Sequence, residues 1–237
     1  MDRAVPLLQR ALAIDASYAP AAAMIGFCRH FQRDHGLGGP VSEADVAESV
    51  RLARHAIAIG KDDPDALSMA ALVLMVFAGE HAIAMSAIDR ALILNPNSAR
   101  AWHARGFVMV FLNRPELATD ALERAMRLSP LDPQGPGFKS TLAAAHLFAG
   151  QYEEAVEWAD RALHERPNFD PAIGVKVVAC VHLGRIDEAR RWLKLRLELQ
   201  PGLTVAEWKS RAAVRFASPE ILALYVEGLR KAGLPEE

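Results

Sequence analysis

Four stretches of this chain repeat one spacing of small and apolar residues that ends in a proline. Successive pattern positions lie four, three and five residues apart, and the closing prolines recur about one helical hairpin apart. A small residue at the first position lets two helices approach closely, the next two positions share its helical face, and the proline ends the helix. A repeat of this length is typical of stacked helical hairpins rather than of a closed globule. The four stretches are Ala84-Ile88-Ala91-Pro96, Ala118-Leu122-Ala125-Pro130, Ala155-Ala159-Ala162-Pro167 and Ala189-Leu193-Arg196-Pro201.

This spacing predicts an all-α, right-handed superhelical solenoid of about five helical hairpins. We expect the solenoid to cover residues 1–202 and a pair of helices at 203–237 to cap its open end. A helix at 2–14 repeats the spacing but lacks the first helix of its hairpin, so the face of Ala4, Leu8 and Ala11 is expected to be exposed. The expected hairpins lie at about 19–60, 64–95, 98–129, 138–166 and 170–200.

Two places depart from the regular pattern. The glycine-rich run from Gly36 to Pro40 lengthens the first hairpin and is interpreted as a flexible insertion, after which Ser42 and Asp45 form a capping-box signal. Arg196 stands where the pattern expects a small residue. Its aliphatic stem is predicted to lie over the next helix while the guanidinium reaches water.

The clearest unit, residues 97–130, resembles the tetratricopeptide repeat (TPR). Its first helix carries Trp102, Gly106 and Met109, and its second carries the alanine pattern that Pro130 closes. The unit departs from the family pattern at Arg105, where a leucine is usual, and at Met109, where a tyrosine is usual. The resemblance implies stacked hairpins that bind other proteins.

Residues 95–133 and the tail from Tyr225 to Pro235 also resemble the C-terminal TPR region of rhizobial multidomain proteins. Those proteins carry an adenylate/guanylate cyclase domain or a winged-helix domain upstream. The resemblance implies an interaction or regulatory module of a bacterial signalling protein. No cyclase residue can be carried over onto this sequence, so we expect no enzymatic activity. Whether Met1 is a natural start or the edge of a longer protein stays open.

Composition narrows the classes of partner. The 27 basic and 29 acidic residues give a net charge of −2, which argues against the clustered basic face that nucleic-acid binding needs. Cys28 and Cys180 lie far apart in apolar helical patterns and are expected to be reduced core residues. We expect no signal peptide and no membrane insertion, because the most apolar window, 66–78, is too short to span a bilayer. A cytoplasmic location is therefore expected.

The sequence shows no catalytic or metal-binding motif. No pair among the eight histidines has a His-Glu-x-x-His spacing, and the two cysteines form no Cys-x-x-Cys pair. The run from Gly36 lacks the Lys-Ser/Thr of a phosphate-binding loop. We therefore expect no metal and no cofactor.

The concave groove is the candidate binding site. In a stack of this kind the first helix of each hairpin lines the groove, and its residues here are mostly apolar with few cations, unlike grooves that grip acidic tails. Such a groove suits an amphipathic helix or extended segment of a partner, anchored by Phe107 and Met75. That some of these residues pack between hairpins instead is an equally open alternative. The candidates are Ser68, Leu72, Met75, Arg100, His103, Phe107, Val110, Ser140, Ala144, Leu147, Val178 and His182, with Gly174 and Val181 on the same face.

Three functional hypotheses follow. The first is a non-catalytic module that binds a protein or peptide segment in this groove. The second is self-assembly into a homo-oligomer through the open N-terminal helix. The third is an all-helical enzyme, which would require His103, His146 and His182 to converge on one pocket with a carboxylate.

Overall fold

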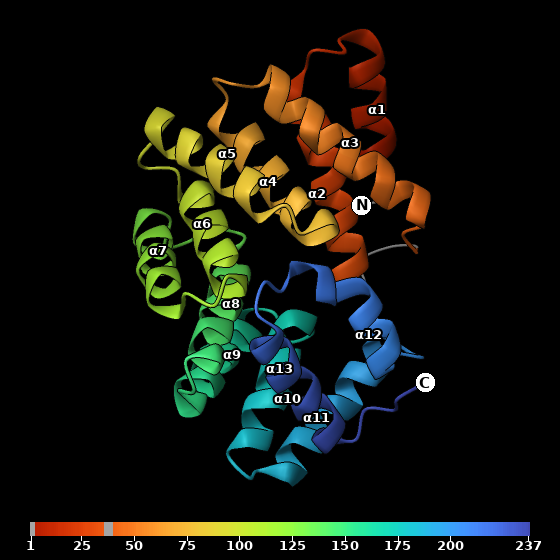
Figure 1. Cartoon of the computed structure of the whole chain (residues 1–237), viewed down its shortest axis with the longest axis vertical. Coiled ribbons are helices and arrows are strands. Elements are labelled where there is room, and N and C mark those ends of the chain that lie inside the picture. The colour runs from red at the N-terminus through yellow and green to blue at the C-terminus, as the bar shows by residue number, and fades with distance from the viewer. Residues whose placement is uncertain (1–2, 36–39) are drawn as a thin grey trace. The chain divides into compact units, whose positions relative to one another are not determined.

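The protein is all-α, as the spacing predicts. The computed structural model describes residues 3–35 and 40–237, and the elements in this part of the chain are all helices (Figure 1). They are α1 (Ala4–Ile14), α2 (Ala19–His35), α3 (Glu43–Ile59), α4 (Pro64–Ala78), α5 (His81–Leu94), α6 (Ala99–Phe111), α7 (Pro115–Leu128), α8 (Gly135–Phe148), α9 (Tyr152–Glu165), α10 (Asp170–His182), α11 (Ile186–Leu199), α12 (Val205–Ala212), the short 3-10 helix η1 (Ala213–Arg215) and α13 (Pro219–Ala232). The expected start of the first helix at residue 2 and the expected insertion at 36–39 lie outside the described residues.

The repeating positions are buried in all four second helices that carry the pattern. In α5, α7, α9 and α11 every residue of the pattern before the proline is at least 96% buried. Side chains four and three residues apart lie on one face of a helix, so each second helix presents a narrow stripe to its neighbours. Small residues at the outer positions of this stripe permit close packing.

The closing prolines set where the second helices end. α5, α7, α9 and α11 each end two residues before a proline, and the intervening residues have φ between −129° and −141° and ψ between 76° and 91°. These residues are Asn95, Ser129, Arg166 and Gln200. The residue before a proline is sterically excluded from the helical region, which accounts for this extended backbone. The prolines thus fix the length of every repeat.

The turn inside each hairpin also recurs. One residue with positive φ follows each of α4, α6, α8 and α10, and after α6 it is Asn113 (φ 56°) rather than glycine. Left-handed backbone lets the next N–H reach back to a carbonyl five or six residues earlier, as in the 2.9 Å bond from Arg114 N to Met109 O. The four residues are Gly79, Asn113, Gly150 and Gly184.

The described residues fall into two compact units, one up to Val108 and one from Met109 onward. In the first unit α4 packs against α2, α3 and α5 and is buried on all sides from Ala66 to Phe77. The capping box predicted at the start of α3 is confirmed, because the Ser42 hydroxyl accepts from Asp45 N and the Asp45 carboxylate accepts from Ser42 N. α1 contacts α2, yet none of its residues is buried.

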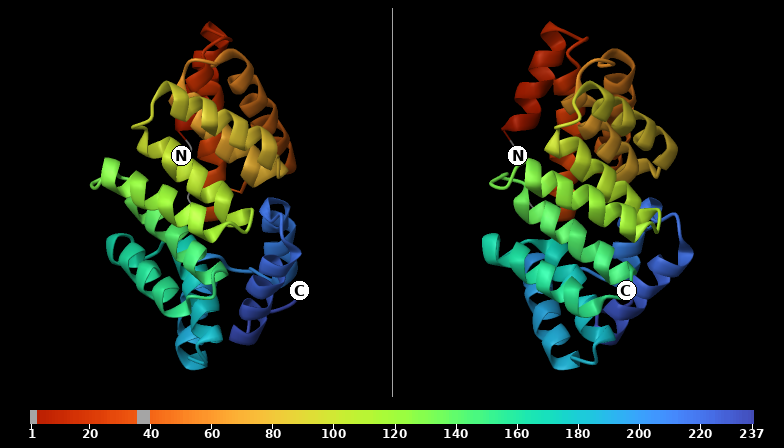
Figure 2. Two further views of the ribbon diagram at one scale, coloured as in Figure 1. Left: turned by 60° about the vertical axis from the view of Figure 1, so that its left-hand side comes forward. Right: turned by 90° about the vertical axis from the view of Figure 1, so that its left-hand side faces the viewer.

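In the second unit the C-terminal helix lies on the first helix of the last hairpin. α13 packs against α10 more extensively than against α11. In Figure 2 the C-terminal helices, coloured blue, lie next to the cyan helices of this unit. The interface is close, because a Cβ added at Gly228 would lie 2.6 Å from Val178 Cγ1. Residues 203–237 therefore belong to the same compact unit as the preceding hairpins, and α13 covers the side of α10 that the sequence assigned to the groove.

Candidate functional site

Seven of the twelve candidate groove residues are buried, which corrects the expectation that they face an open groove. Ser68, Leu72, Met75, Val110, Ser140, Leu147 and Val178 are all at most 4% exposed. Arg100, His103, Phe107, Ala144 and His182 are partly exposed. The equally open alternative, packing between helices, is what the structure shows for the first group.

Burial of the α4 candidates has a clear cause. Because α4 contacts three other helices, no side of it is exposed to solvent, and Met75 is fully buried. The Ser68 hydroxyl donates to Pro64 O at 2.7 Å, so its hydrogen bond is made within its own helix. Met75, predicted as a partner anchor, is instead a core residue of the first unit.

A partly exposed strip remains on α6, formed by Arg100, His103 and Phe107. These residues lie three and four positions apart and so share one helical face. The His103 ring meets the Phe107 ring edge-on, with centroids 6.4 Å apart. The Arg100 Nε lies 3.3 Å from Asp65 Oδ1, and its guanidinium lies 5.8 Å from the centre of the Phe27 ring. We call these three residues the α6 strip.

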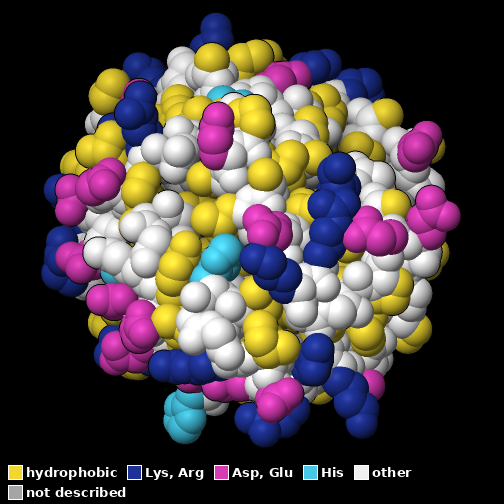
Figure 3. Space-filling model, turned by 60° about the horizontal axis from the view of Figure 1, so that its bottom comes forward, with side chains coloured by type: hydrophobic (Ala, Val, Ile, Leu, Met, Phe, Trp, Pro, Cys, Tyr) yellow, Lys and Arg dark blue, Asp and Glu magenta, His cyan; other side chains and the backbone are white. Residues whose placement is uncertain are grey.

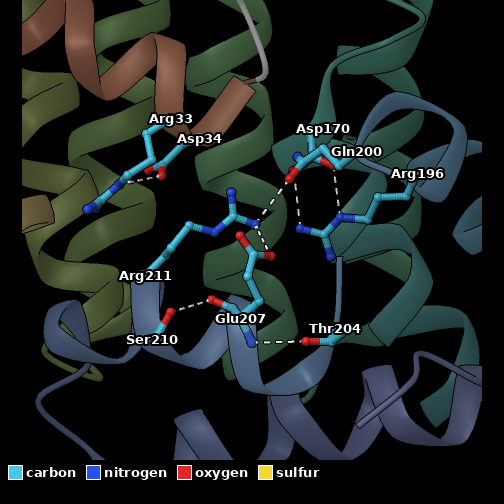
Figure 4. A network of polar contacts seen from close by, with 9 residues as sticks. All are labelled: Arg33, Asp34, Asp170, Arg196, Gln200, Thr204, Glu207, Ser210 and Arg211. Carbon is cyan, nitrogen blue, oxygen red and sulfur yellow. Dashed lines mark hydrogen bonds and ion pairs between the residues drawn. The ribbon is translucent and has the colours of Figure 1, made fainter. Parts of the chain in front are cut away.

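Arg196 is buried in the second unit and forms an ion pair, which corrects the prediction that its guanidinium reaches water. The residue is only 3% exposed, and Asp170, at the start of α10, is 5% exposed. Arg196 Nε donates to Asp170 Oδ1 at 2.8 Å and Nη2 donates to Oδ2 at 3.1 Å (Figure 4). This two-pronged geometry is the strong form of an arginine–carboxylate contact. A large cation therefore occupies the position where the other repeats have alanine.

Tyr225 of α13 completes this buried polar group. Its hydroxyl and Arg196 Nη1 both lie over Gly174, where an added Cβ would be 2.5 Å from Tyr225 Oη and 3.1 Å from Arg196 Nη1. Only glycine therefore leaves room for the hydroxyl. Burial raises the pKa of Tyr225, which keeps its hydroxyl protonated at neutral pH. Burial alone would lower the pKa of Arg196, but the interactions with Asp170 and Tyr225 together outweigh it and raise that pKa, so the guanidinium stays charged.

An aromatic cluster joins the C-terminal segment to earlier helices of the second unit. Phe216 meets Phe111 and Phe148 edge-on, with ring centroids 4.9 and 6.0 Å away. Trp208 stacks on Tyr225 at 4.7 Å and contacts Phe216 at 6.0 Å. A backbone hydrogen bond joins the same two segments, since Ala217 N donates to Phe111 O at 3.0 Å.

A second polar group lies on α12. Arg211 Nη2 donates to Gln200 Oε1 at 3.1 Å and to Glu207 Oε2 at 3.0 Å, and Glu207 N donates to the Thr204 hydroxyl at 3.1 Å (Figure 4). These contacts connect the end of α11 to α12. They orient the segment that leads into Phe216.

The three histidines of the enzyme hypothesis have different surroundings. His146 Nδ1 lies 2.7 Å from Gln151 Oε1, and His182 stacks on the Tyr152 ring at 4.7 Å. His103 belongs to the α6 strip of the first unit. No group of three or more His, Cys, Asp or Glu side chains within residues 3–35 and 40–237 is arranged to hold a metal ion.

The two cysteines are buried free thiols, as the sequence predicts. Burial raises the pKa of both thiols, and that of Cys180 reaches about 11. Thiolate is the reactive form of cysteine, so neither residue is suited to nucleophilic chemistry at neutral pH.

The surface carries mixed charge. Figure 3 shows basic and acidic side chains interspersed on one face of the molecule. In the part of the chain that the structure describes, no helix has the length and apolar character needed to cross a membrane.

Sequence reasoning missed Asp170, Phe216 and Tyr225. Asp170 was interpretable only as an acid at a helix start, and Tyr225 only as an apolar residue of the last helix. The signal that could have found them was Arg196, because a cation in an alanine position requires a buried partner.

Comparisons with known proteins identify the repeats. A family model described as tetratricopeptide repeat matches residues 149–210, and a second with the same description matches residues 136–161. A human relative, "FK506-binding protein-like", is 34% identical over 120 residues, covering 48% of this chain and 32% of the relative. The chain thus spans about a third of the length of that curated relative.

Solved structures share the fold at low identity. Pseudomonas aeruginosa pilF aligns with a TM-score of 0.59 and 18% identity over 92% of this chain and 93% of its own. PilW, a type IV pilus biogenesis factor, aligns with a TM-score of 0.60 and 19% identity over 79% and 86%. The Cut9–Hcn1 structure aligns with a TM-score of 0.64 and 14% identity over 96% of this chain but 39% of that one. Such identities show the fold alone, a stack of helical hairpins, of which residues 136–210 match the tetratricopeptide-repeat models.

Removing the charge of Asp170 tests the buried ion pair. Asp170→Asn leaves the Arg196 guanidinium buried without its counter-ion, which costs about 3–5 kcal/mol. The matched control is Asp187→Asn on α11, since Asp187 pairs at 3.8 Å with Arg190 and is 95% exposed at its side chain. That exposed pair contributes at most about 1 kcal/mol. Urea denaturation followed by circular dichroism measures both, and equal midpoints for the two variants would contradict the assignment.

Proposed function

We propose that this tetratricopeptide-repeat protein is a non-catalytic interaction module that binds a segment of a partner protein along the α6 strip. Stacked helical hairpins provide extended surfaces rather than enclosed active sites, which supports a scaffold role. The α6 strip supports the site, because it combines a partly exposed aromatic ring with a cation and a histidine on one helical face. Aromatic and arginine side chains dominate the energetics of protein interfaces.

The strip favours a partner segment with an apolar or aromatic anchor. Phe107 is a partly exposed aromatic side chain on which such an anchor can pack. Arg100, which pairs with Asp65 and lies near the Phe27 ring, is a partly exposed cation on the same face.

The fold supports the proposed role, and the α6 strip is the proposed site. A bacterial signalling context is part of this proposal and rests on the resemblance of residues 95–133 and 225–235 to rhizobial signalling proteins. A cytoplasmic location is also part of it and rests on the unpaired cysteines Cys28 and Cys180.

Phe107→Asp tests this site. We expect peptides selected on the native chain from a random display library to bind the variant at least about thirtyfold more weakly, because an interface anchor contributes about 2 kcal/mol or more. The control is Leu131→Asp, which places the same charge at a residue that is 94% exposed and outside the strip. Circular dichroism establishes that both variants fold. Equal peptide binding by the native chain and a folded Phe107→Asp chain would exclude the α6 strip as the site.

A second candidate function is self-association through α1. No residue of this helix is buried, and Leu7 and Ile14 are 61% and 89% exposed. A helix whose large apolar side chains remain exposed favours pairing with another apolar surface.

Light scattering during size-exclusion chromatography measures this association. We expect the mass of the native chain to rise with concentration and that of the double variant Leu7→Glu, Ile14→Glu to stay at one chain, because each glutamate would place a charge in the contact. Leu131→Glu, a change of the same kind elsewhere, serves as the control. A native chain that stays monomeric at every concentration excludes this function.

A further inference from the structure

The face of α10 expected to line the groove is covered by the protein's own C-terminal helix. Gly174 and Val178 lie four residues apart and share this face, and α13 contacts both. Tyr225 Oη fills the space above Gly174, and Gly228 lies directly on Val178. Two glycines, one on each helix, thus allow close contact at two points along the interface.

α13, the helix that covers this face, is amphipathic, as peptide ligands of helical grooves often are. One side of α13 is buried and carries Ile221, Tyr225, Val226, Leu229 and Ala232, each at most 7% exposed. The opposite side carries exposed charges, including Glu227 and Arg230. An amphipathic helix that lays its apolar face on a helical groove is a recurring mode of peptide recognition.

A polar group beside the α10 face, the Arg196 guanidinium, lies next to the Tyr225 hydroxyl. Arg196 is neutralised by Asp170 in a two-pronged contact, and its Nη1 lies beside the Tyr225 hydroxyl above Gly174. A ligand that lacks this hydroxyl would leave the buried guanidinium without a polar neighbour at that point, so the site discriminates against it. Tyr225 therefore makes both an apolar and a polar contact with the face.

The segment before α13 extends the occupied surface to other first helices. Phe216 contacts Phe111 at the end of α6 and Phe148 on α8, and Trp208 of α12 packs against the same ring. The segment from α12 to α13 thus contacts α8, α10 and the last turn of α6 within the second unit. This is the surface on which repeats of this kind hold other chains.

We propose that residues 205–232 act as an internal ligand of the second unit, and that a helical segment of a partner protein displaces them. The geometry of the α10 face defines that segment. It carries a tyrosine for the Gly174–Arg196 site and, three residues later, a glycine where it crosses Val178. This proposal concerns a surface separate from the α6 strip and does not depend on the function assigned to that strip.

Gly228→Val releases the internal ligand without changing any residue of the groove. The new side chain would collide with Val178, which lies 2.6 Å from the position of its Cβ. Ala223→Val is the matched control, because it places the same β-branched residue at an exposed position of the same helix. Phe216→Ala is a second releasing variant that acts through the aromatic cluster.

The probe is a fluorescent synthetic peptide with the sequence of residues 218–234, added to each full chain and followed by anisotropy. We expect the Gly228→Val and Phe216→Ala chains to bind it at least about tenfold more tightly than the native and Ala223→Val chains. The attached native helix competes at an effective concentration in the millimolar range, which suppresses binding of the free peptide. The same peptide with valine in place of its glycine is expected not to bind.

Several results would overturn the proposal. One is equal peptide binding by all four chains. Another is failure of both releasing variants to fold, which would make α13 an integral part of the unit. A native dimer that the peptide dissociates, seen by light scattering, would identify a second copy of this chain as the occupant instead of a partner protein. Because the assay uses only this chain and its own peptide, none of these results bears on the α6 strip.

Discussion

Close approach of helices at alanine positions is the contact on which each repeat of this structure depends. Ala84, Ala118, Ala155 and Ala189 are all fully buried, so no larger side chain fits there without moving a helix. The prolines that follow end each second helix at a fixed distance from this contact. Regular stacking results from these two constraints together.

The last repeat has a large residue at one of the alanine positions, and neighbouring residues accommodate it. Arg196 occupies an alanine position, and Asp170, Gly174 and Tyr225 provide its charge partner, its space and an adjacent hydroxyl. A buried ion pair contributes little net stability by itself, but an unpaired buried charge is costly. The exception in the pattern is therefore linked to the position of α13 on α10.

The fold was predictable from the sequence to a greater extent than the site. Alanine spacing and prolines are local signals, so helix type and hairpin order could be derived from them. Exposure of the groove could not, because Leu72 and Met75 have the same apolar character whether they face a partner or the core. Burial of Arg196 depended on Asp170, 26 positions earlier in the sequence, and on Tyr225 of a helix that follows the repeats. Such contacts are set by tertiary packing rather than by a local pattern.

Native-state hydrogen exchange tests most directly whether α13 is a separable occupant of the second unit. The account predicts that the amides of Val226 and Leu229 exchange through a partial opening, at lower free energy and with a smaller denaturant dependence than those of Val177 and Ala179 in α10. Exchange of all four amides in a single opening, with the free energy of global unfolding, would contradict it.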